Sequence, residues 1–284
     1  MRSPISPEDY ERFRVFLEDA CGITLGDNKQ YLIASRIGPL LDEYRIPSVG
    51  ALVERLRCER QPALYERIVD AMTTNETLWF RDGFPFEILK QVILPEQVRQ
   101  KGIGLRLWSA ACSSGQEPYT LSMCVEEYFR ANPAPLASNV QIIATDLSPS
   151  MLEQARAGVY DAAAMARGLS EERKRQFFQE RFGRWEVRDG IKRRVSFREH
   201  NLMQSFEPLG KFQVIFCRNV LIYFSADLKR DILARLAAAL HPGGYLFLGA
   251  AEAITGYSDA FEMLRLPQGI VYRLKPAARA VRSG

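Results

Sequence analysis

The sequence predicts an α/β fold in which a doubly wound, largely parallel sheet follows a small all-α domain. Residues 1–75 carry helical patterns and no strand signal, whereas short apolar runs alternate with helical patterns from about residue 105 onward. Apolar runs bounded by turn residues are typical of strands buried on both faces, and their alternation with helices favours a parallel sheet. Residues 158–210 interrupt the alternation and indicate an inserted subdomain.

Four helices are expected in the amino-terminal region. The first, over residues 7–20, begins with Ser6 as its N-cap, a proline at the first helical position and acids in the first turn. Asp27 or Asn28 can cap the second helix, which Gly38-Pro39 should kink or divide because proline removes a backbone donor. Two further helical patterns run over residues 48–56 and 62–72.

The parallel sheet is expected to contain four strands joined by helices. The strands are predicted at Leu105–Ala111, Val140–Asp146, Phe212–Asn219 and Tyr245–Gly249. The helices are predicted at Phe84–Val98, Glu117–Phe129, Pro149–Ala157 and Ala226–Leu240, and His241-Pro242-Gly243-Gly244 should close the last of them. An antiparallel pair should complete the sheet, at Phe261–Leu264 and Gly269–Leu274.

The inserted segment is expected to contain a hairpin. Arg184–Val187 and Arg193–Arg198 flank Asp189-Gly190, a dipeptide typical of tight hairpin turns. The predicted division of the chain is a helical domain at 1–75, a linker helix at 76–98, and an α/β domain at 99–284 with the inserted β-subdomain at about 158–200.

Composition indicates an ordinary globular protein. Of the 284 residues, 47% are hydrophobic and 25% are charged, close to globular averages. No apolar run approaches the roughly 20 residues that span a bilayer, and the amino terminus lacks the apolar stretch of a signal peptide. We therefore expect a cytoplasmic protein without direct membrane insertion. Five scattered cysteines and two histidines favour neither a disulfide framework nor a metal site.

The net charge of +4 is unevenly distributed. Residues 1–90 hold 12 Lys and Arg against 15 Asp and Glu, whereas residues 151–200 hold 12 against 8. The basic excess includes Lys192, Arg193 and Arg194. It is either a solvated surface or an electrostatic footprint for an acidic partner.

Candidate binding residues follow the predicted strands, because ligands of open α/β sheets bind beyond the carboxyl ends of the strands. The first strand runs into small residues at 110–115, which let a ligand approach the backbone. Asp146 ends the second strand, where an acid commonly accepts hydrogen bonds from ribose. Its alternative role is to cap the next helix, which Ser148 can do instead. Asn219 and Tyr223 are polar groups in an apolar setting that a ligand can satisfy.

Four strings of the sequence occur in the order of a known family. TTNETLWFRD at 73–82, LWSAACSSGQEPYT at 107–120, ATDLS at 144–148 and FCRNVLIYF at 216–224 together resemble the CheR-type chemotaxis receptor methyltransferases. The resemblance covers nearly the whole chain. It implies a Rossmann-like methyltransferase domain that transfers a methyl group from S-adenosylmethionine to glutamate side chains of chemotaxis receptors. The products would be glutamyl methyl esters, used in sensory adaptation, and S-adenosylhomocysteine.

The resemblance also implies which residues hold the methyl donor. Asn75, Thr77 and Arg81 would line the donor site, with Arg81 pairing with the donor's carboxylate. Glu117 would receive the donor's amino group, and Asp146 its ribose. Arg81 is thus expected to serve both binding and catalysis.

Further implied residues lie later in the chain. The adenine would be flanked by Asn201, Leu202, Asn219 and Val220. Tyr223 would stand near the sulfonium and the incoming carboxylate as the second catalytic residue. A glutamate substrate is already ionised at neutral pH, since its unperturbed pKa is near ~4.3, and needs no catalytic base. Cys112 and Cys217 are accordingly expected to be structural.

The implied partners are the cytoplasmic methylation helices of receptors, bound by a monomer. Members of the family often carry several arginines on the second helix, whereas here Arg36 is followed by Gly38-Pro39 and two acids before Arg45. Four cations on later helices could share the docking task or be solvated: Arg55, Arg57, Arg60 and Arg67. The segment around Gly183 is short, so capture of a carboxyl-terminal receptor tether peptide is not expected.

Two other function classes stay open at this point. A nucleic-acid methyltransferase shares the donor fold, but the Asn/Asp-Pro-Pro-aromatic motif and a strongly basic, aromatic-rich tract are absent from the sequence. Nucleic acid is therefore not an expected partner. A signalling module that binds the donor without catalysis would keep the pocket but could lose Tyr223 or Asn219, and both are present.

Overall fold

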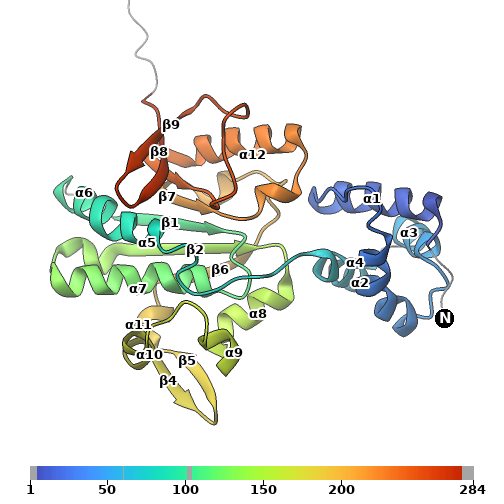
Figure 1. Cartoon of the computed structure of the whole chain (residues 1–284), viewed down its shortest axis with the longest axis horizontal. Helices are drawn as coiled ribbons and strands as arrows, with labels where there is room; N and C mark the ends of the chain where they lie inside the picture. The colour runs from blue at the N-terminus through green and yellow to red at the C-terminus, as the bar shows by residue number, and fades with distance from the viewer. Residues whose placement is uncertain (1–4, 60, 101–103, 277–284) are drawn as a thin grey trace, which may run out of the picture.

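A computed structural model describes residues 5–59, 61–100 and 104–276 of the chain. A helical domain lies beside an α/β domain, and a small three-stranded subdomain projects from the α/β domain (Figure 1). The predicted fold class, an all-α domain followed by a Rossmann-like sheet with an inserted β-subdomain, is confirmed.

Four helices enclose the apolar core of the amino-terminal domain. They are α1 (Pro7–Cys21), α2 (Gln30–Glu43), α3 (Val49–Cys58) and α4 (Pro62–Met72). The expected cap of α1 is confirmed, because the Ser6 hydroxyl accepts a hydrogen bond of 3.0 Å from the Asp9 N–H. Ser48 caps α3 in the same way. All four helices contribute to the core, through side chains such as Phe13, Ile33, Leu52 and Ile68.

The expected N-cap of α2 is wrong, and the helix is not divided at Gly38-Pro39. Lys29 holds the N-cap position without a side-chain hydrogen bond, because Asn28 adopts a left-handed φ of 61° and, like Asp27, belongs to the preceding turn. Pro39 lies inside the helix and does not divide it. An interior proline costs about 3 kcal/mol, but burying one aliphatic side chain contributes roughly 1.5–3 kcal/mol. Three buried side chains flank the proline and hold the helix on the core: Ile37, Leu40 and Leu41.

The α/β domain is built on a seven-stranded sheet with the order β6-β2-β1-β7-β8-β10-β9. Its strands are β1 (Leu105–Ala110), β2 (Val140–Asp146), β6 (Val195–Glu199), β7 (Phe212–Cys217), β8 (Leu240–Phe247), β9 (Phe261–Leu266) and β10 (Gly269–Leu274). The first five strands in the sheet order are parallel, and β10 and β9 are antiparallel to their neighbours. The strand order reverses between β1 and β7, where ligands of such folds bind.

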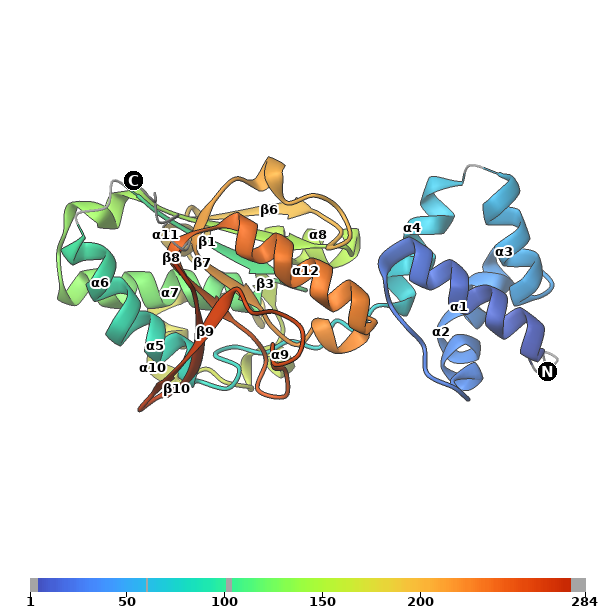
Figure 2. The ribbon, with the colours of Figure 1, turned by 90° about the horizontal axis from the view of Figure 1, so that it is seen from above.

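Helices cover both faces of this sheet (Figures 1 and 2). One face packs against α7 (Gln116–Ala131) and α8 (Pro149–Ala157), and the other packs against α12 (Ala226–Ala239). Adjacent strand residues serve opposite faces, so Ile142 belongs to the core under α7 and Ile143 to the core under α12. The short 3₁₀ turns η2 (Pro135–Asn139) and η3 (Glu207–Leu209) lie in the connections.

The helix predicted at Phe84–Val98 begins at Phe84 as expected, but the first part of the predicted 76–98 linker helix is not helical. Residues 76–83 are irregular, and a helical rod then runs through α5 (Phe84–Ile88), the π-helical turn η1 (Leu89–Ile93) and α6 (Leu94–Arg99). Phe80, Asp82 and Gly83 all have positive φ, which a helix does not permit. The irregular segment brings Arg81 to the carboxyl edge of the sheet, described below.

The hairpin predicted for the inserted subdomain pairs the wrong strands. The small sheet has the order β3-β5-β4, with β3 (Val159–Tyr160), β4 (Phe178–Arg181) and β5 (Arg184–Val187). The Asp189-Gly190 dipeptide begins a short helix instead of a turn, and the following strand joins the large sheet as β6. Pairing β5 with β4 buries Phe178 and Val187 together, which the expected pairing would not do. The subdomain also contains α9 (Ala162–Met165), α10 (Glu171–Phe177) and α11 (Asp189–Lys192).

The ends of four strands also differ from expectation, and in β9 the difference is only that the strand runs to Leu266 instead of Leu264. β1 stops at Ala110, and β7 stops at Cys217 because Asn219 has a φ of 58°, incompatible with a strand. β8 already begins at Leu240, so residues 241–244 extend the strand and do not close α12. The shorter strands leave loops at the carboxyl edge of the sheet, where the site lies.

Candidate active site

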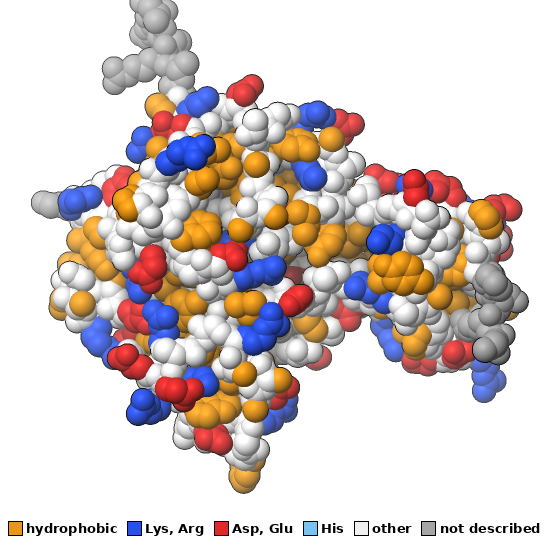
Figure 3. Space-filling model, viewed as in Figure 1, with side chains coloured by type: hydrophobic (Ala, Val, Ile, Leu, Met, Phe, Trp, Pro, Cys, Tyr) orange, Lys and Arg blue, Asp and Glu red, His pale blue; other side chains and the backbone are white. Residues whose placement is uncertain are grey.

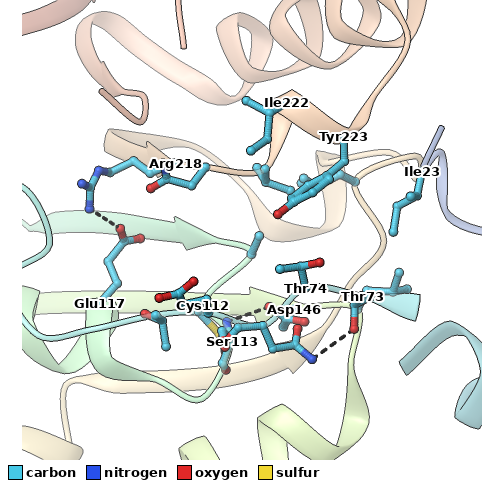
Figure 4. Close-up of a pocket in the computed structure, with 18 of the residues that line it drawn as sticks. Ile23, Thr73, Thr74, Cys112, Ser113, Glu117, Asp146, Arg218, Ile222 and Tyr223 are labelled. Carbon is cyan, nitrogen blue, oxygen red and sulfur yellow. Dashed lines mark hydrogen bonds and ion pairs between the residues drawn. The ribbon is translucent and has the colours of Figure 1, made fainter. Parts of the chain in front are cut away.

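A pocket lies at the carboxyl edge of the parallel strands, between the two domains. Its walls come from the Thr73–Arg81 segment, the loops after β1, β2, β6 and β7, and the end of α1. Figure 4 shows Arg218 and Tyr223 across the pocket from Ser113 and Asp146. The pocket therefore occupies the position that the strand order predicts for a ligand.

Strained backbone is concentrated in the loops around this pocket. Eight non-glycine residues among those described have positive φ, and five of them lie in the segments that border the pocket. These five are Phe80, Asp82, Ala111, Ser113 and Asn219. Left-handed conformations cost free energy for residues other than glycine and persist only when surrounding contacts hold them. These loops therefore adopt conformations that are unfavourable in themselves, as is typical of ligand-binding sites.

Asp146 ends β2 and is almost fully buried, with 7% of its surface exposed. One carboxylate oxygen accepts a hydrogen bond of 2.7 Å from the Ser113 N–H, and the other accepts one of 2.9 Å from the Ser148 N–H. Burial raises the pKa of Asp146, and these backbone N–H groups oppose the rise. Since a carboxylate offers about four lone pairs, capacity remains for ligand hydroxyls. Ser148 is the N-cap of α8, which frees Asp146 from that role.

Glu117, in the first turn of α7, is held by two partners. One oxygen accepts a hydrogen bond from the Ser109 hydroxyl at 2.7 Å, and the other forms an ion pair with Arg218 at 2.9 Å. The Arg218 side chain is 2% exposed and also pairs with Asp82 at 2.6 Å and donates to the Arg81 carbonyl. Arg218 therefore ties the Glu117 carboxylate to the strained Arg81 segment.

Glu252 holds the loop that follows β7. Its carboxylate accepts hydrogen bonds of 2.7 Å from the N–H groups of Asn219 and Gly249, and one of 3.3 Å from Ile222. A Cβ at Gly249 would lie 2.5 Å from the Asn219 amide nitrogen, so only glycine permits this approach. The left-handed conformation of Asn219 is thus fixed by a carboxylate 33 residues away in sequence.

The amino-terminal domain completes the pocket. Cys21 and Ile23 line it, and Thr24 donates from both its backbone N–H and its hydroxyl to the Tyr223 carbonyl, at 2.9 and 3.0 Å. Asn201 donates from its side chain to the Ala20 carbonyl at 3.0 Å. The helical domain therefore fixes the loops that carry Asn201 and Tyr223.

The structure brings all ten predicted site residues to this one pocket. They are Asn75, Thr77, Arg81, Glu117, Asp146, Asn201, Leu202, Asn219, Val220 and Tyr223. Arg81 donates only to the Glu76 carbonyl at 3.2 Å among the described residues, and the Asn75 carbonyl accepts from the Ser113 hydroxyl at 2.8 Å. The roles that the resemblance implies for the ten residues remain predictions.

The thiols near the pocket are poor nucleophiles. Burial raises the pKa of Cys112 and of Cys217 well above the ordinary value, and it raises the pKa of Cys21 to about 11. Burial also lowers the pKa of His200, which packs against Trp108. The described residues contain no cluster of three acidic, cysteine or histidine side chains able to hold a metal ion.

Three residues of the site were missed by sequence reasoning. Ser113 and Arg218 lie inside the quoted motifs, so their presence was visible, but their partners Asp146 and Glu117 are distant in sequence. Glu252 lies outside every motif, and its role depends on the approach of the Gly249 loop to the loop after β7. No local pattern in the sequence indicates that contact.

The sheet order, the carboxylate at the end of β2 and the pocket at the switch point define a nucleotide-type ligand site in a Rossmann-like fold. The CheR methyltransferase SAM-binding domain model matches residues 75–270, and the CheR methyltransferase all-alpha domain model matches residues 8–73. The chain therefore belongs to the CheR methyltransferase family, and S-adenosylmethionine is its cofactor.

Two curated relatives support the same family. The chain is 54% identical over 269 residues to chemotaxis protein methyltransferase Cher2 of Pseudomonas putida, covering 94% of this chain and 98% of that protein. It is 56% identical over 269 residues to chemotaxis protein methyltransferase 1 of Pseudomonas aeruginosa, with the same coverage of 94% and 98%. No helix among the described residues is long and apolar enough to cross a bilayer.

The pocket has the polar groups that this cofactor requires. S-adenosylmethionine carries an amino group, a carboxylate and two ribose hydroxyls. Asp146 and Glu117 supply carboxylates that each retain acceptor capacity, and Arg81 supplies a guanidinium at the pocket wall. The residues present therefore fit the cofactor.

Proposed function

We propose that this protein methylates glutamate side chains on the cytoplasmic methylation helices of chemotaxis receptors. The product would be a glutamyl methyl ester, which serves sensory adaptation. Family membership supports methyl transfer in chemotaxis, and the chemistry of the pocket supports a carboxylate as the acceptor.

The proposal rests mainly on the contacts within the chain that already occupy the two carboxylates of the pocket, Asp146 and Glu117. Asp146 accepts two hydrogen bonds from backbone N–H groups, and Glu117 accepts one from the Ser109 hydroxyl and is paired with the buried Arg218. Neither is placed as a free base that would deprotonate an amine or hydroxyl. The buried thiols, with their raised pKa values, are no better suited. A substrate that is already anionic, such as glutamate, needs no such base.

The donor-binding roles in this proposal are those that the family resemblance implies, and all of these residues line the pocket. Arg81 pairs with the donor's carboxylate, Glu117 receives its amino group and Asp146 receives the ribose. Asn75 and Thr77 complete this side of the pocket. S-adenosylmethionine supplies the activated methyl group when it is bound.

The remaining residues hold the far end of the donor and the acceptor. The adenine is flanked by Asn201, Leu202, Asn219 and Val220. Tyr223 points into the pocket in Figure 4 and orients the incoming carboxylate near the sulfonium. Arg81, with a guanidinium bonded only to one backbone carbonyl among the described residues, helps to draw an anionic side chain to the same place.

The arginines of the helical domain contribute less to docking than their number suggests. Arg36 donates to the Met72 and Thr73 carbonyls at the end of α4, so it serves the fold. Arg67 is paired with Glu43, and Arg55 with Glu59 at 3.4 Å. Arg60 lies outside the described residues. Arg57 is exposed and makes no ion pair within the described part of the chain.

The test is transfer of tritium from labelled S-adenosylmethionine to a purified cytoplasmic fragment of a chemotaxis receptor. Carboxyl methyl esters release labelled methanol in mild base, whereas methyl groups on nucleobases or amines do not. We expect base-labile label on glutamate. Base-stable label, or label on added nucleic acid only, would contradict the proposal, and binding of the donor without transfer would indicate a non-catalytic module.

A further inference from the structure

The β4–β5 hairpin of the inserted subdomain ends in a fully exposed aromatic side chain. The hairpin projects away from the large sheet, and hydrophobic side-chain atoms occupy its end in the space-filling view (Figures 1 and 3). Phe182 is 106% exposed, whereas the next most exposed large hydrophobic residue among those described, Tyr31, is 63% exposed. Phe182 therefore contributes no burial to the fold.

The backbone at this tip is also strained. The turn consists of Phe182 and Gly183, with φ values of 52° and 72°, and a two-residue hairpin loop with two positive φ values is the type I′ arrangement. Asparagine, aspartate or glycine is strongly preferred at the first of these positions. Phenylalanine there costs free energy without any compensating contact.

A third unfavourable feature adjoins the turn. Arg181 and Arg184 are directly opposite each other in the β4–β5 pair, and like charges in that position destabilise a hairpin. Arg181 has a distant partner in Glu186 at 3.7 Å, but Glu186 is already engaged by Lys192 at 2.9 Å. Arg184 forms no ion pair or side-chain hydrogen bond within the described residues.

The exposed ring and the two arginines would be favourable against a partner that offers an apolar pocket and acidic groups. Because side chains alternate along a strand, Glu180 lies on the opposite face of the hairpin from the two arginines. Glu186 shares the arginines' face but is engaged by Lys192, so that face keeps a basic excess. Aromatic residues and arginines are also the side chains that dominate binding energy at protein interfaces.

We propose that the Arg181–Arg184 tip is a docking finger that inserts Phe182 into an apolar pocket on the acidic surface of the substrate receptor. This inference rests on the proposed function, which requires a substrate that carries carboxylates. The contact is made by side chains at the turn and not by addition of a receptor strand to the exposed edge of β4.

A protein surface suits the finger better than a bilayer does. One phenyl ring and two cations are too few to hold a protein at a membrane, because even a single myristoyl chain gives only marginal binding. The same small contact is effective when the active site engages the same partner, since the second contact then forms at a high effective concentration.

The decisive variant is Phe182→Asn, because asparagine suits the turn better than phenylalanine does. A merely structural role for Phe182 predicts no loss of activity, and the thermal midpoint should stay or rise. The docking role predicts a fall of roughly fivefold to thirtyfold in kcat/KM for the receptor fragment. Phe182→Tyr should keep most of the rate, and Arg184→Glu should lower it.

The readouts are the initial rate of base-labile methylation at low receptor concentration, the affinity for S-adenosylhomocysteine and the thermal midpoint. Each variant is tested on a soluble receptor fragment with and without its last few residues. We expect unchanged product affinity and the same fall in rate on both fragments. An unchanged rate for Phe182→Asn overturns the proposal, and so does a fall that disappears when the receptor's last residues are removed.

Two further outcomes are distinguishable. If only the wild type cosediments with phosphatidylglycerol vesicles, while all variants methylate the soluble fragment equally, the finger binds lipid and the proposal is wrong. If the wild type itself transfers no base-labile methyl group to any receptor fragment, the proposed function fails, and the partner named here fails with it.

Discussion

The pocket and the hairpin tip both contain strained backbone, but only the pocket holds it in place. Asn219 is fixed by the Glu252 carboxylate, and Ser113 by Asp146. Phe182 has a similar φ, yet its side chain is fully exposed. The same kind of conformation is therefore heavily supported in one region and unsupported in the other.

This difference separates two ways in which a protein prepares a site. A pocket that is held by its own hydrogen bonds is preorganised and binds a small ligand at little ordering cost. An exposed, locally unfavourable tip gains its contacts only when a partner arrives. Substitutions in the pocket should thus lower donor affinity or turnover, whereas substitutions at the tip should change capture of the receptor alone.

Among the changes in the pocket, removal of Asp146 should have the largest effect. Asp146→Ala deletes a charged acceptor, and losing a hydrogen bond to a charged group costs roughly 1.5–3 kcal/mol, or about 10- to 150-fold in affinity for S-adenosylhomocysteine. Calorimetric titration measures it, with Arg81→Ala as a companion. Asp161→Ala is the control, because Asp161 caps α9 outside the pocket. Unchanged affinity in both pocket variants would refute the donor-site assignment.

Removal of Glu252 should show how the strained loop is supported. Glu252→Ala leaves three backbone N–H groups without their acceptor, which costs about 1–3 kcal/mol of stability, and it should lower turnover roughly tenfold as Asn219 relaxes. Glu262→Ala, which removes an exposed pair with Arg273, should cost less than about 1 kcal/mol. Urea unfolding and methylation rates test both. Equal losses in the two variants would show that Glu252 is an ordinary surface acid.

Tyr223 should affect the chemical step more than donor binding. Tyr223→Phe removes only the hydroxyl, so affinity for S-adenosylhomocysteine should stay within about twofold while turnover falls roughly tenfold, equivalent to one lost hydrogen bond to a charged group. Tyr257→Phe, outside the pocket, is the matched control. A parallel loss of stability and affinity with normal turnover per bound donor would make Tyr223 a core residue.

How much of the molecule the sequence predicts depends on whether the signal is local. Ser6 caps its helix as expected, and β2 has its predicted bounds, because caps and apolar runs are decided by neighbours. The hairpin partner was wrong because Asp189-Gly190 is a strong turn signal, whereas burial of Phe178 against Val187 depends on the fold. Local rules cannot weigh that tertiary contact.

The site shows the same limit. The family resemblance placed all ten candidate residues around one pocket. Three of the four motifs follow strand ends at the same edge of the sheet, whereas the motif at 73–82 reaches that edge from the end of α4. The residues that hold them were not predicted, since Arg218 reaches Glu117 across 101 positions and Glu252 reaches Asn219 across 33. The residues that line the pocket can thus be predicted largely from motifs and strand ends, whereas the residues that hold them in place become apparent only in the folded structure.

The smallest effect is expected from the basic segment after the hairpin. Two of its cations are already paired within the chain, because Arg194 contacts Glu126 at 2.6 Å and Lys192 contacts Glu186 at 2.9 Å. Less positive charge is therefore left to attract an acidic partner. Arg193 is exposed and has no ion pair in the described residues. Reversing its charge in Arg193→Glu should therefore lower the methylation rate only about 1.4- to fivefold, the range of an exposed charge pair.

Ionic strength should act in the same direction. The screening length falls from about 10 Å at 0.1 M salt to about 3 Å at 1 M, so salt should weaken receptor capture in the wild type and less so in Arg193→Glu. Initial rates at several salt concentrations, on receptor fragments with and without their last few residues, measure both effects. If removing those residues abolishes methylation while salt changes little, capture depends on a receptor tether, and the basic surface of the enzyme is only a solvated face.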